Sequence, residues 1–324
     1  MEEFELIRKF FESSTLQRDD VVLGIGDDCA LLSPPPAKQL AISTDTLVSG
    51  VHFPETTSAY NIGYKSLAVN LSDLAAMGAE PAWVSLAMTL PKSNSAWIEQ
   101  FMQGFNALAC LYPLSLIGGD TTSGALSVTV SIIGFVDAST ALKRSNARPG
   151  DAIFVTGNIG DARLGLESYL NQLQMGQSQM DYFRNSLDRP EPQIQAGLIL
   201  SRYKHVAAID LSDGLLADLQ HICDASGVGA TLRLQNLPLS NELRDFYTDA
   251  INWPLLLNAG DDYQLCFTCS LDDSLSIKKE FKHNNIKMTQ IGEITSATSI
   301  SCYQHDIEIN TEHFSGYTHF SDEK

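Results

Sequence analysis

The chain has 324 residues, of which 44% are hydrophobic and 19% charged, so it can build a hydrophobic core and does not belong to the disordered class. Its 39 Asp and Glu against 21 Lys and Arg give a net charge of −18, which repels nucleic acids and anionic lipids and excludes both as expected partners. A nucleotide would need metal cations between itself and such a chain. At roughly 150 residues per domain, the length indicates about two domains.

Two features bear on where the protein works. The first residues, Met1–Glu5, are acidic and do not resemble a signal peptide. The longest apolar run, Val128–Val136, is about half as long as a membrane-spanning helix. We therefore expect a cytoplasmic protein that does not enter a membrane.

The six cysteines are expected to be buried thiols, because a chain of this length does not need disulfide cross-links. Only Cys266 and Cys269 form a C-x-x-C pair, and they fall in a run typical of a strand. Three positions apart on a strand, their side chains point to opposite faces, which argues against a shared metal ion.

In the first half of the chain, the hydrophobic pattern alternates between strands and helices. It predicts a strand at Leu40–Asp45 and a helix at Ser58–Met77 with Leu67, Leu71 and Leu74 on one stripe. The other predicted elements are strands at 83–90, 114–117 and 126–136 and a helix at 95–110.

The turn Asn146–Asp151 contains a Pro-Gly pair and is the predicted boundary between an N-terminal domain, 1–148, and a C-terminal domain, 149–324. Beyond it we predict a strand at Ala152–Thr156, a helix from about Ala162, a strand at 207–211 and a helix from 212 or 213. The Gln-rich segment 171–192 is predicted to be a mobile surface connection. The pattern favours a mixed α/β (α+β) fold with two domains.

Common phosphate-binding signatures are missing from the chain. It has no Gly-Lys dipeptide, and therefore no P-loop, and neither His-Arg-Asp nor Asp-Phe-Gly of the protein kinases. The segment Thr156–Asp161 follows a predicted strand, but its glycines are not spaced as in G-x-G-x-x-G, so we expect a structural turn.

The most informative feature is the position of the aspartates. Asp45, Asp120 and Asp210 each stand at the end of an apolar segment predicted to be a strand. Asp73 lies on a predicted helix rich in Ala and Leu. Each acid alone is explained as a helix cap or a turn residue. Together they indicate oxygen ligands for a hard cation such as Mg²⁺, and the neighbouring small residues would let phosphates approach the backbone. The residues alone therefore predict metal-assisted phosphate chemistry.

Six motifs, read in order, resemble those of the bacterial thiamine-monophosphate kinase family, in the superfamily of aminoimidazole ribonucleotide synthetase. The motifs are Gly24-Ile-Gly-Asp-Asp28-Cys-Ala, Ile42-Ser-Thr-Asp45-Thr, Val51-His52-Phe, Asn70-Leu-Ser-Asp73-Leu-Ala-Ala-Met-Gly-Ala79, Ile117-Gly-Gly-Asp120-Thr-Thr and Ile209-Asp-Leu-Ser-Asp-Gly214. The resemblance covers essentially the whole chain. It implies a homodimer with a two-domain architecture of the aminoimidazole ribonucleotide synthetase type, in which an N-terminal domain binds ATP and metal and forms the dimer interface, and a C-terminal α/β domain completes the substrate site.

The reaction that this resemblance implies is Mg²⁺-dependent transfer of the ATP γ-phosphoryl group to thiamine monophosphate, giving thiamine diphosphate. The implied catalytic residues are Asp73, Asp120 and Asp210. The implied metal ligands are Asp28, Ser43, Thr44, Asp45, Asp73, Asp120, Asp210 and Asp213. The implied ATP contacts are Gly119, Asp120, Arg144 and Ser212, and the implied substrate contacts are His52, Asp261 and Tyr317. Because Ser43 and Asp45 point the same way on a strand, Thr44 is expected to bind metal differently, through its carbonyl group.

The chain departs from the family at one motif and leaves two alternatives open. Where the family usually has Gly-Gly-Glu-Asp-Tyr-Glu, this chain has Ala259-Gly-Asp261-Asp262-Tyr-Gln264, so the carboxylate of Asp261 is one methylene shorter. One alternative is another ATP-using enzyme of the same superfamily, such as a selenophosphate or aminoimidazole ribonucleotide synthetase. The other is an acidic cation- or nucleotide-binding protein without catalytic activity.

Overall fold

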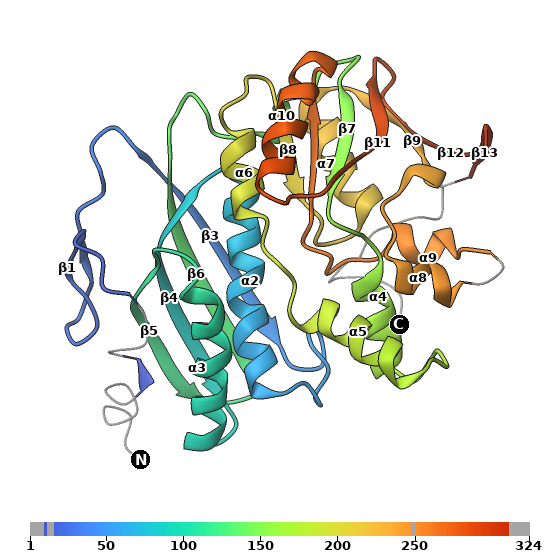
Figure 1. Cartoon of the computed structure of the whole chain (residues 1–324). Coiled ribbons are helices and arrows are strands. Elements are labelled where there is room, and N and C mark those ends of the chain that lie inside the picture. Colours follow the sequence, from blue (N-terminus) through green and yellow to red (C-terminus); the bar gives the residue numbers. More distant parts are fainter. Residues whose placement is uncertain (1–9, 12–15, 248–249, 311–324) are drawn as a thin grey trace. The chain divides into compact units, whose positions relative to one another are not determined.

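The protein folds as two compact units, which we describe separately (Figure 1). The computed structural model describes residues 10–11, 16–247 and 250–310. Unit 1 comprises Met1–Leu74 and Ala79–Ser139, and unit 2 comprises Ala75–Gly78 and Thr140–Lys324. Both combine helices with a sheet, which confirms the mixed α/β class, while the domain boundary at 148/149 stays a prediction.

Unit 1 is built on a four-stranded sheet in the order β3-β6-β4-β5. Its strands are β3 (Gln39–Val48), β4 (Glu80–Leu90), β5 (Ser115–Ser123) and β6 (Ser127–Val136). Two helices, α2 (Ala59–Met77) and α3 (Ser95–Ala109), lie against each other, because Gly63 and Gly104 lack the Cβ atoms that would collide with the backbone of the other helix. The predicted stripe Leu67, Leu71 and Leu74 is fully buried on α2.

A small second core lies on the sheet face opposite α2. There Trp83 and Phe135 pack edge to face, 5.0 Å between ring centroids. The ribbon of β1 (Val21–Leu23) and β2 (Leu31–Leu32) covers them with Val21 and Leu32. The short ribbon carries the Gly-Asp-Asp motif in the turn between its strands.

Two strands of unit 1 run further than the sequence predicts. Asp45 and Asp120 were expected at strand ends, but β3 continues to Val48 and β5 to Ser123, so both acids lie within strands. The reason is that β3 pairs with β6 along its whole length and β5 pairs with β4, and the threonines that follow each acid favour extended backbone.

Unit 2 is built on a seven-stranded mixed sheet in the order β13-β12-β9-β11-β7-β10-β8. Its strands are β7 (Ala152–Thr156), β8 (Ala207–Asp210), β9 (Gly229–Arg233), β10 (Leu265–Cys269), β11 (Met288–Thr295), β12 (Ile300–Gln304) and β13 (Ile307–Ile309). Its helices are η1 (Arg144–Asn146), α4 (Asp161–Tyr169), α5 (Gln177–Asp188), α6 (Ile194–Leu200), α7 (Leu215–Ser226), η2 (Leu234–Asn236), α8 (Asn241–Phe246), α9 (Trp253–Leu257) and α10 (Leu271–His283).

The central strands of this sheet are buried on both faces. Val155 and Cys266 belong to one core together with residues of α7 such as Leu219. On the other face Phe154 stacks on Phe267, which in turn contacts Phe281 of α10. Strand β7 matches its prediction because a short apolar run between turns is typical of a strand buried on both sides.

The prediction of a mobile connection at 171–192 is wrong, because helix α5 lies within it. Phe183 and Leu187, one turn apart, are buried, and the backbone of Phe183 approaches Gly165 of α4. Glutamine is a good helix former, so the Gln-rich composition that suggested a loop is compatible with an amphipathic helix.

The expectation of buried thiols holds for four cysteines and is wrong for Cys29 and Cys110, which are exposed. Cys29 lies in the turn of the β1–β2 ribbon, and Cys110 is the residue after α3. Among the described residues, none of the helices combines the length and the hydrophobicity that crossing a bilayer requires.

Candidate active site

In unit 1 the structure brings Ser43, Asp45 and Asp73 to one face of the sheet. The hydroxyl of Ser43 on β3 donates to Oδ2 of Asp73 on α2, at 2.5 Å. Asp45 follows two positions later on β3 and so points to the same face as Ser43. Three predicted metal ligands therefore point toward the α2 side of β3.

Thr44 points to the opposite face, as the alternation along β3 requires. Its Oγ1 lies 2.8 Å from Oγ of Ser131, its neighbour in the register with β6. The side chain of Thr44 is therefore separated from Ser43 and Asp73, and a part for its backbone carbonyl in metal binding stays a prediction.

The helix that carries Asp73 holds a second oxygen atom suited to a hard cation. Asn70, one turn before Asp73, is fully buried and donates its Nδ2 to the carbonyl of Ser66 at 3.0 Å, but its Oδ1 accepts no hydrogen bond among the described residues. Amide, hydroxyl and carboxylate oxygens are the ligands that Mg²⁺ takes, so this donor set fits the ion. No three carboxylate, imidazole or thiolate groups of the described residues are grouped closely enough to hold a metal alone. Mg²⁺ typically uses one or two carboxylates, with phosphates and water completing its shell.

Asp28 and Asp120 stand apart from this group. Both are exposed, Asp28 in the turn of the β1–β2 ribbon and Asp120 opposite Ala87 in the register of β5 with β4. Gly119 has a packing reason to be glycine, because a Cβ there would collide with the carbonyl of Leu86. Gly118, by contrast, has nothing within 4 Å of its missing Cβ and leaves room for a ligand.

His52, a predicted substrate contact, follows β3 in a turn that fixes its ring. The backbone N–H of Val48 donates to its Nδ1 at 3.0 Å, so in the neutral ring Nε2 carries the hydrogen. Its carbonyl accepts from Nζ of the buried Lys65 at 3.3 Å. In this tautomer Nε2 is the donor of the ring, and an N–H donor is the kind of group that suits a phosphate oxygen.

In unit 2 the structure brings Asp210, Ser212, Asp213 and Asp261 to one edge of the sheet. Asp210 ends β8 and is paired in the register with Leu265, which begins β10. The backbone N–H of Asp261 donates to the carbonyl of Ser212 at 3.0 Å. Predicted metal, ATP and substrate residues of this unit thus share one loop cluster.

Asp218, which the sequence analysis missed, lies beneath this cluster. It is 2% exposed, and its Oδ2 accepts from the backbone N–H groups of Asp213 and Gly214, both at 3.1 Å. Burial, followed by the negative charges of Asp210 and Asp213, raises the pKa of Asp218 to about 7. A sequence signal existed, because Asp218 shares the helix stripe of the buried Leu215.

Arg144 and Tyr317 are not part of this cluster as described. The carbonyl of Arg144 accepts from Ser226 at the end of α7, and neighbouring Asn146 bonds to Val206 just before β8. Arg144 therefore lies at the end of β8 opposite to that of Ser212. Tyr317 lies outside the described residues.

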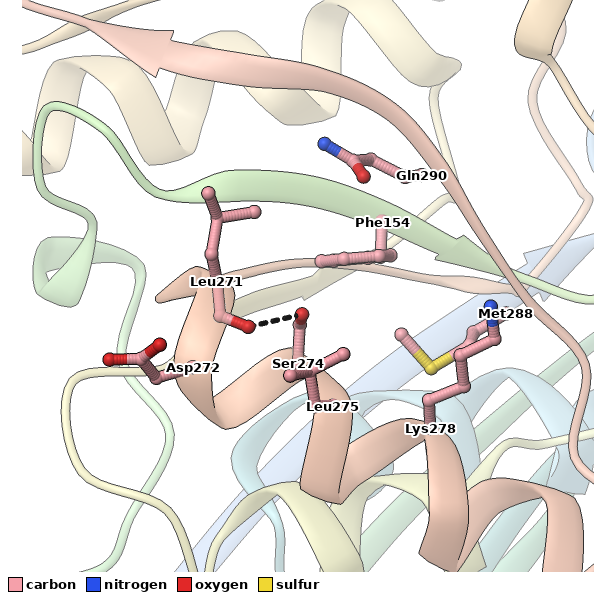
Figure 2. A pocket seen from close by; sticks show the side chains of 8 residues that line it. All are labelled: Phe154, Leu271, Asp272, Ser274, Leu275, Lys278, Met288 and Gln290. Carbon is pink, nitrogen blue, oxygen red and sulfur yellow. Dashed lines mark hydrogen bonds between the residues drawn. The ribbon is translucent and has the colours of Figure 1, made fainter.

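A separate hollow of about 380 Å³ lies on unit 2 over α10, β7 and β11 (Figure 2). Its lining residues are Phe154, Leu271, Asp272, Ser274, Leu275, Lys278, Met288 and Gln290. None of the residues predicted to bind metal, ATP or substrate lines it. The loop cluster after β8, and not this hollow, is therefore the candidate site of unit 2.

Two family models match the chain. Residues 26–136 match the N-terminal domain of AIR synthase related proteins, and residues 148–304 match their C-terminal domain. This likeness agrees with the two-domain architecture of the aminoimidazole ribonucleotide synthetase type.

Similar proteins occur in several bacteria. The thiamine-monophosphate kinase of Escherichia coli is 45% identical over 322 residues, which are 98% of each chain, and that of Bacillus subtilis is 37% identical over 304 residues, 92% of this chain and 93% of the relative. Among solved structures, thiamine-monophosphate kinase of Stenotrophomonas maltophilia is 44% identical with a TM-score of 0.86, covering 93% of this chain and 96% of that chain. AaThiL in complex with AMPPCP and TMP is 30% identical with a TM-score of 0.77, covering 91% and 92%.

Proposed function

Because the chain belongs to the thiamine-monophosphate kinase family, we propose that it transfers the γ-phosphoryl group of ATP to thiamine monophosphate, producing thiamine diphosphate and ADP. The observation that carries this proposal is the similarity over nearly the full length to relatives of that name, one of which was solved with AMPPCP and TMP. The oxygen-bearing side chains on β3 and α2 of unit 1 and in the loop after β8 of unit 2 support it.

The proposed transfer needs no general base. The acceptor is a phosphate whose second pKa is about 6, so its attacking oxygen is already largely ionised near neutral pH. The difficulty is to bring two polyanions together in line and to stabilise the charge on the transferred group. We therefore expect direct transfer without a phosphorylated enzyme, and trapping a phosphorylated side chain with ATP alone would contradict it.

The residues proposed to hold magnesium ions fit the chemistry of that cation. They are Asp28, Ser43, Thr44, Asp45, Asp73, Asp120, Asp210 and Asp213, with Asp73, Asp120 and Asp210 as the catalytic acids. When bound, magnesium would neutralise phosphate charge. The buried oxygen of Asn70 and the Ser43–Asp73 contact support the assignment in unit 1.

The nucleotide and the acceptor are assigned to different loops. Gly119, Asp120, Arg144 and Ser212 are proposed to contact ATP, and His52, Asp261 and Tyr317 to contact thiamine monophosphate. The donor Nε2–H of His52 suits the phosphate, and the carboxylate of Asp261 suits the cationic thiazolium end of the acceptor.

A homodimer is the proposed assembly, formed through unit 1. Strand β3 has ten residues and lies at the edge of its sheet, where Leu40 and Ile42 are 44% and 64% exposed. A long edge strand with exposed apolar side chains is a template for pairing with another chain, and a second copy would cover it. Sedimentation at micromolar concentration tests this, with the charged variant Ile42→Lys expected to dissociate the dimer. We place the reaction in the cytoplasm, where ATP is supplied.

The deciding experiment measures ADP release from ATP and Mg²⁺ with and without thiamine monophosphate, and identifies the product by mass. Thiamine diphosphate formed only with both substrates supports the proposal. ADP release that does not depend on thiamine monophosphate would instead indicate another ATP-using member of the superfamily. Absence of any nucleotide turnover would support the non-catalytic alternative.

A further inference from the structure

Three loops of unit 2 meet at one edge of its sheet. Strand β10 lies between β7 and β8 and is antiparallel to both, so the last residues of β7 and β8 and the first of β10 share that edge. The loops are 157–160 after β7, 211–214 after β8 and 258–264 before β10. The second and third carry the proposed ATP, metal and acceptor contacts.

The loop 258–264 is bound to the loop 211–214 through backbone hydrogen bonds. Besides the bond from Asp261 to Ser212, Tyr263 donates to the carbonyl of Leu211 at 2.9 Å, and Leu211 donates to the carbonyl of Gln264 at 2.8 Å. These bonds join the backbones of the two loops next to β8 and β10.

The side chain of Asp262 connects this pair of loops to the third. Its Oδ2 accepts from the backbone N–H of Gly160, the N-cap residue of α4, at 2.7 Å. Free N–H groups at a helix N-terminus are suited to a carboxylate. The bond spans 102 residues of sequence.

Neighbouring backbone angles show that this loop is held in an unusual conformation. Asp261 and Tyr263, on either side of Asp262, have φ values of 68° and 48°, in the left-handed region that residues with side chains seldom adopt. Such a conformation persists only where the surrounding contacts impose it. The hydrogen bond of Asp262 to Gly160 and the backbone bonds to the 211–214 loop are among the contacts that hold it.

We propose that Asp262 is a positioning residue, which sets the place of Asp261 for the acceptor by anchoring the 258–264 loop to the start of α4. This inference rests on the proposed function. The 213–214 backbone has its own anchor in Asp218, so the loss of Asp262 is expected to affect the acceptor more than the nucleotide.

The test compares Asp262→Ala with Asp161→Ala in the full chain. Asp161 begins the same helix and is also buried, but its carboxylate accepts from Ser240 and Tyr182, and none of the hydrogen bonds among the described residues joins it to the 258–264 loop. We expect Asp262→Ala to raise KM for thiamine monophosphate about tenfold, since it loses a hydrogen bond to a buried carboxylate, while KM for ATP changes less than about threefold. Asp161→Ala should leave both constants within about threefold.

Asp262→Asn provides the conservative comparison, because its amide oxygen can still accept from Gly160. Its KM for thiamine monophosphate should lie between that of the wild type and that of Asp262→Ala. If Asp262→Ala does not fold, Asp262→Asn is compared with Asp161→Asn instead. Equal changes of KM in the Asp262 and Asp161 variants, or a change of thermal stability alone, would overturn the proposal.

Amide hydrogen exchange separates this inference from the proposed function. If the wild-type protein makes no thiamine diphosphate, the proposed function is refuted. Hydrogen exchange still measures whether Asp262 anchors the loop, because it does not depend on activity. The amides of Leu211 and Tyr263 should lose protection in the Asp262 variants and retain it in the Asp161 variants. Unchanged protection in all of them would refute the anchoring itself.

Discussion

The buried carboxyl group of Asp161 makes the stability of unit 2 depend on pH in a way that one substitution should remove. It is 6% exposed and accepts hydrogen bonds from Ser240 Oγ at 2.6 Å and Tyr182 Oη at 3.1 Å. Burial raises the pKa of Asp161 from 3.8 to about 6; the two hydroxyl donors and the positive Lys287 oppose the shift, and the negative Glu242 adds to it. The folded state therefore binds a proton more tightly than the unfolded chain does.

The magnitude follows from the two pKa values. A rise from 3.8 to about 6 corresponds to about 3 kcal/mol between the two protonation states. This stabilisation is complete below the unfolded pKa and is lost as pH rises through about 6. About 1.4 kcal/mol of this stabilisation is lost between about pH 5 and pH 8. Asp161→Asn keeps the shape of the acid without its titration, so that pH-dependent part should disappear.

Urea unfolding of the wild type and Asp161→Asn, followed by circular dichroism at several pH values, measures the difference directly. The free energy of unfolding of the variant, relative to the wild type, should increase by about 1.4 kcal/mol from about pH 5 to pH 8. Taking this difference across pH cancels the constant effect of replacing an acid by an amide. A relative stability that stays constant, or decreases, would refute the assignment of a raised pKa to this site.

Three further predictions concern single residues. Asp73→Asn should raise the Mg²⁺ concentration for half-maximal velocity about tenfold without moving the pH optimum, and an unchanged Mg²⁺ dependence would contradict its metal-binding role. Gly260→Ala should lower kcat/KM about 100-fold, because the new Cβ would overlap a carbonyl oxygen of the neighbouring loop and displace the acceptor loop by about 1 Å; steady-state kinetics would show it. Alkylation of the folded protein, read by mass, should modify Cys29 and Cys110 only, and labelling of a buried cysteine without unfolding would contradict the described core.

The elements that could be predicted from the sequence are those whose local pattern agrees with their burial. Strand β7 and helix α2 are examples, because an apolar run between turns and a repeating leucine stripe each indicate one structure. The end of β3 could not be found in this way. Its last residues are held by pairing with β6, about 80 residues further along the chain, and no local signal reports such a partner.

The candidate site shows the same division between local and distant information. The separation of Thr44 from Ser43 follows from strand alternation, so it was predictable before the structure was known. The hydrogen bond between Asp262 and Gly160 joins residues that are distant in sequence. From the sequence, Asp262 could be recognised only as a member of a motif, and its partner could not be predicted. Asp218 lies between these cases, because its helix stripe indicates burial but not its hydrogen-bond partners.

The donors to each carboxylate distinguish structural acids from acids that can meet a ligand. Asp262 and Asp218 accept from backbone N–H groups, which cannot turn away, so a cation at these oxygens would face fixed positive dipoles. Asp73 accepts from the hydroxyl of Ser43, which can rotate and present a lone pair to the same cation that binds the carboxylate. A serine beside an aspartate can therefore change from donor to ligand when a cation arrives. This difference supports the proposal that Ser43 and Asp73 are among the magnesium ligands of unit 1, and that Asp218 and Asp262 hold loops in unit 2.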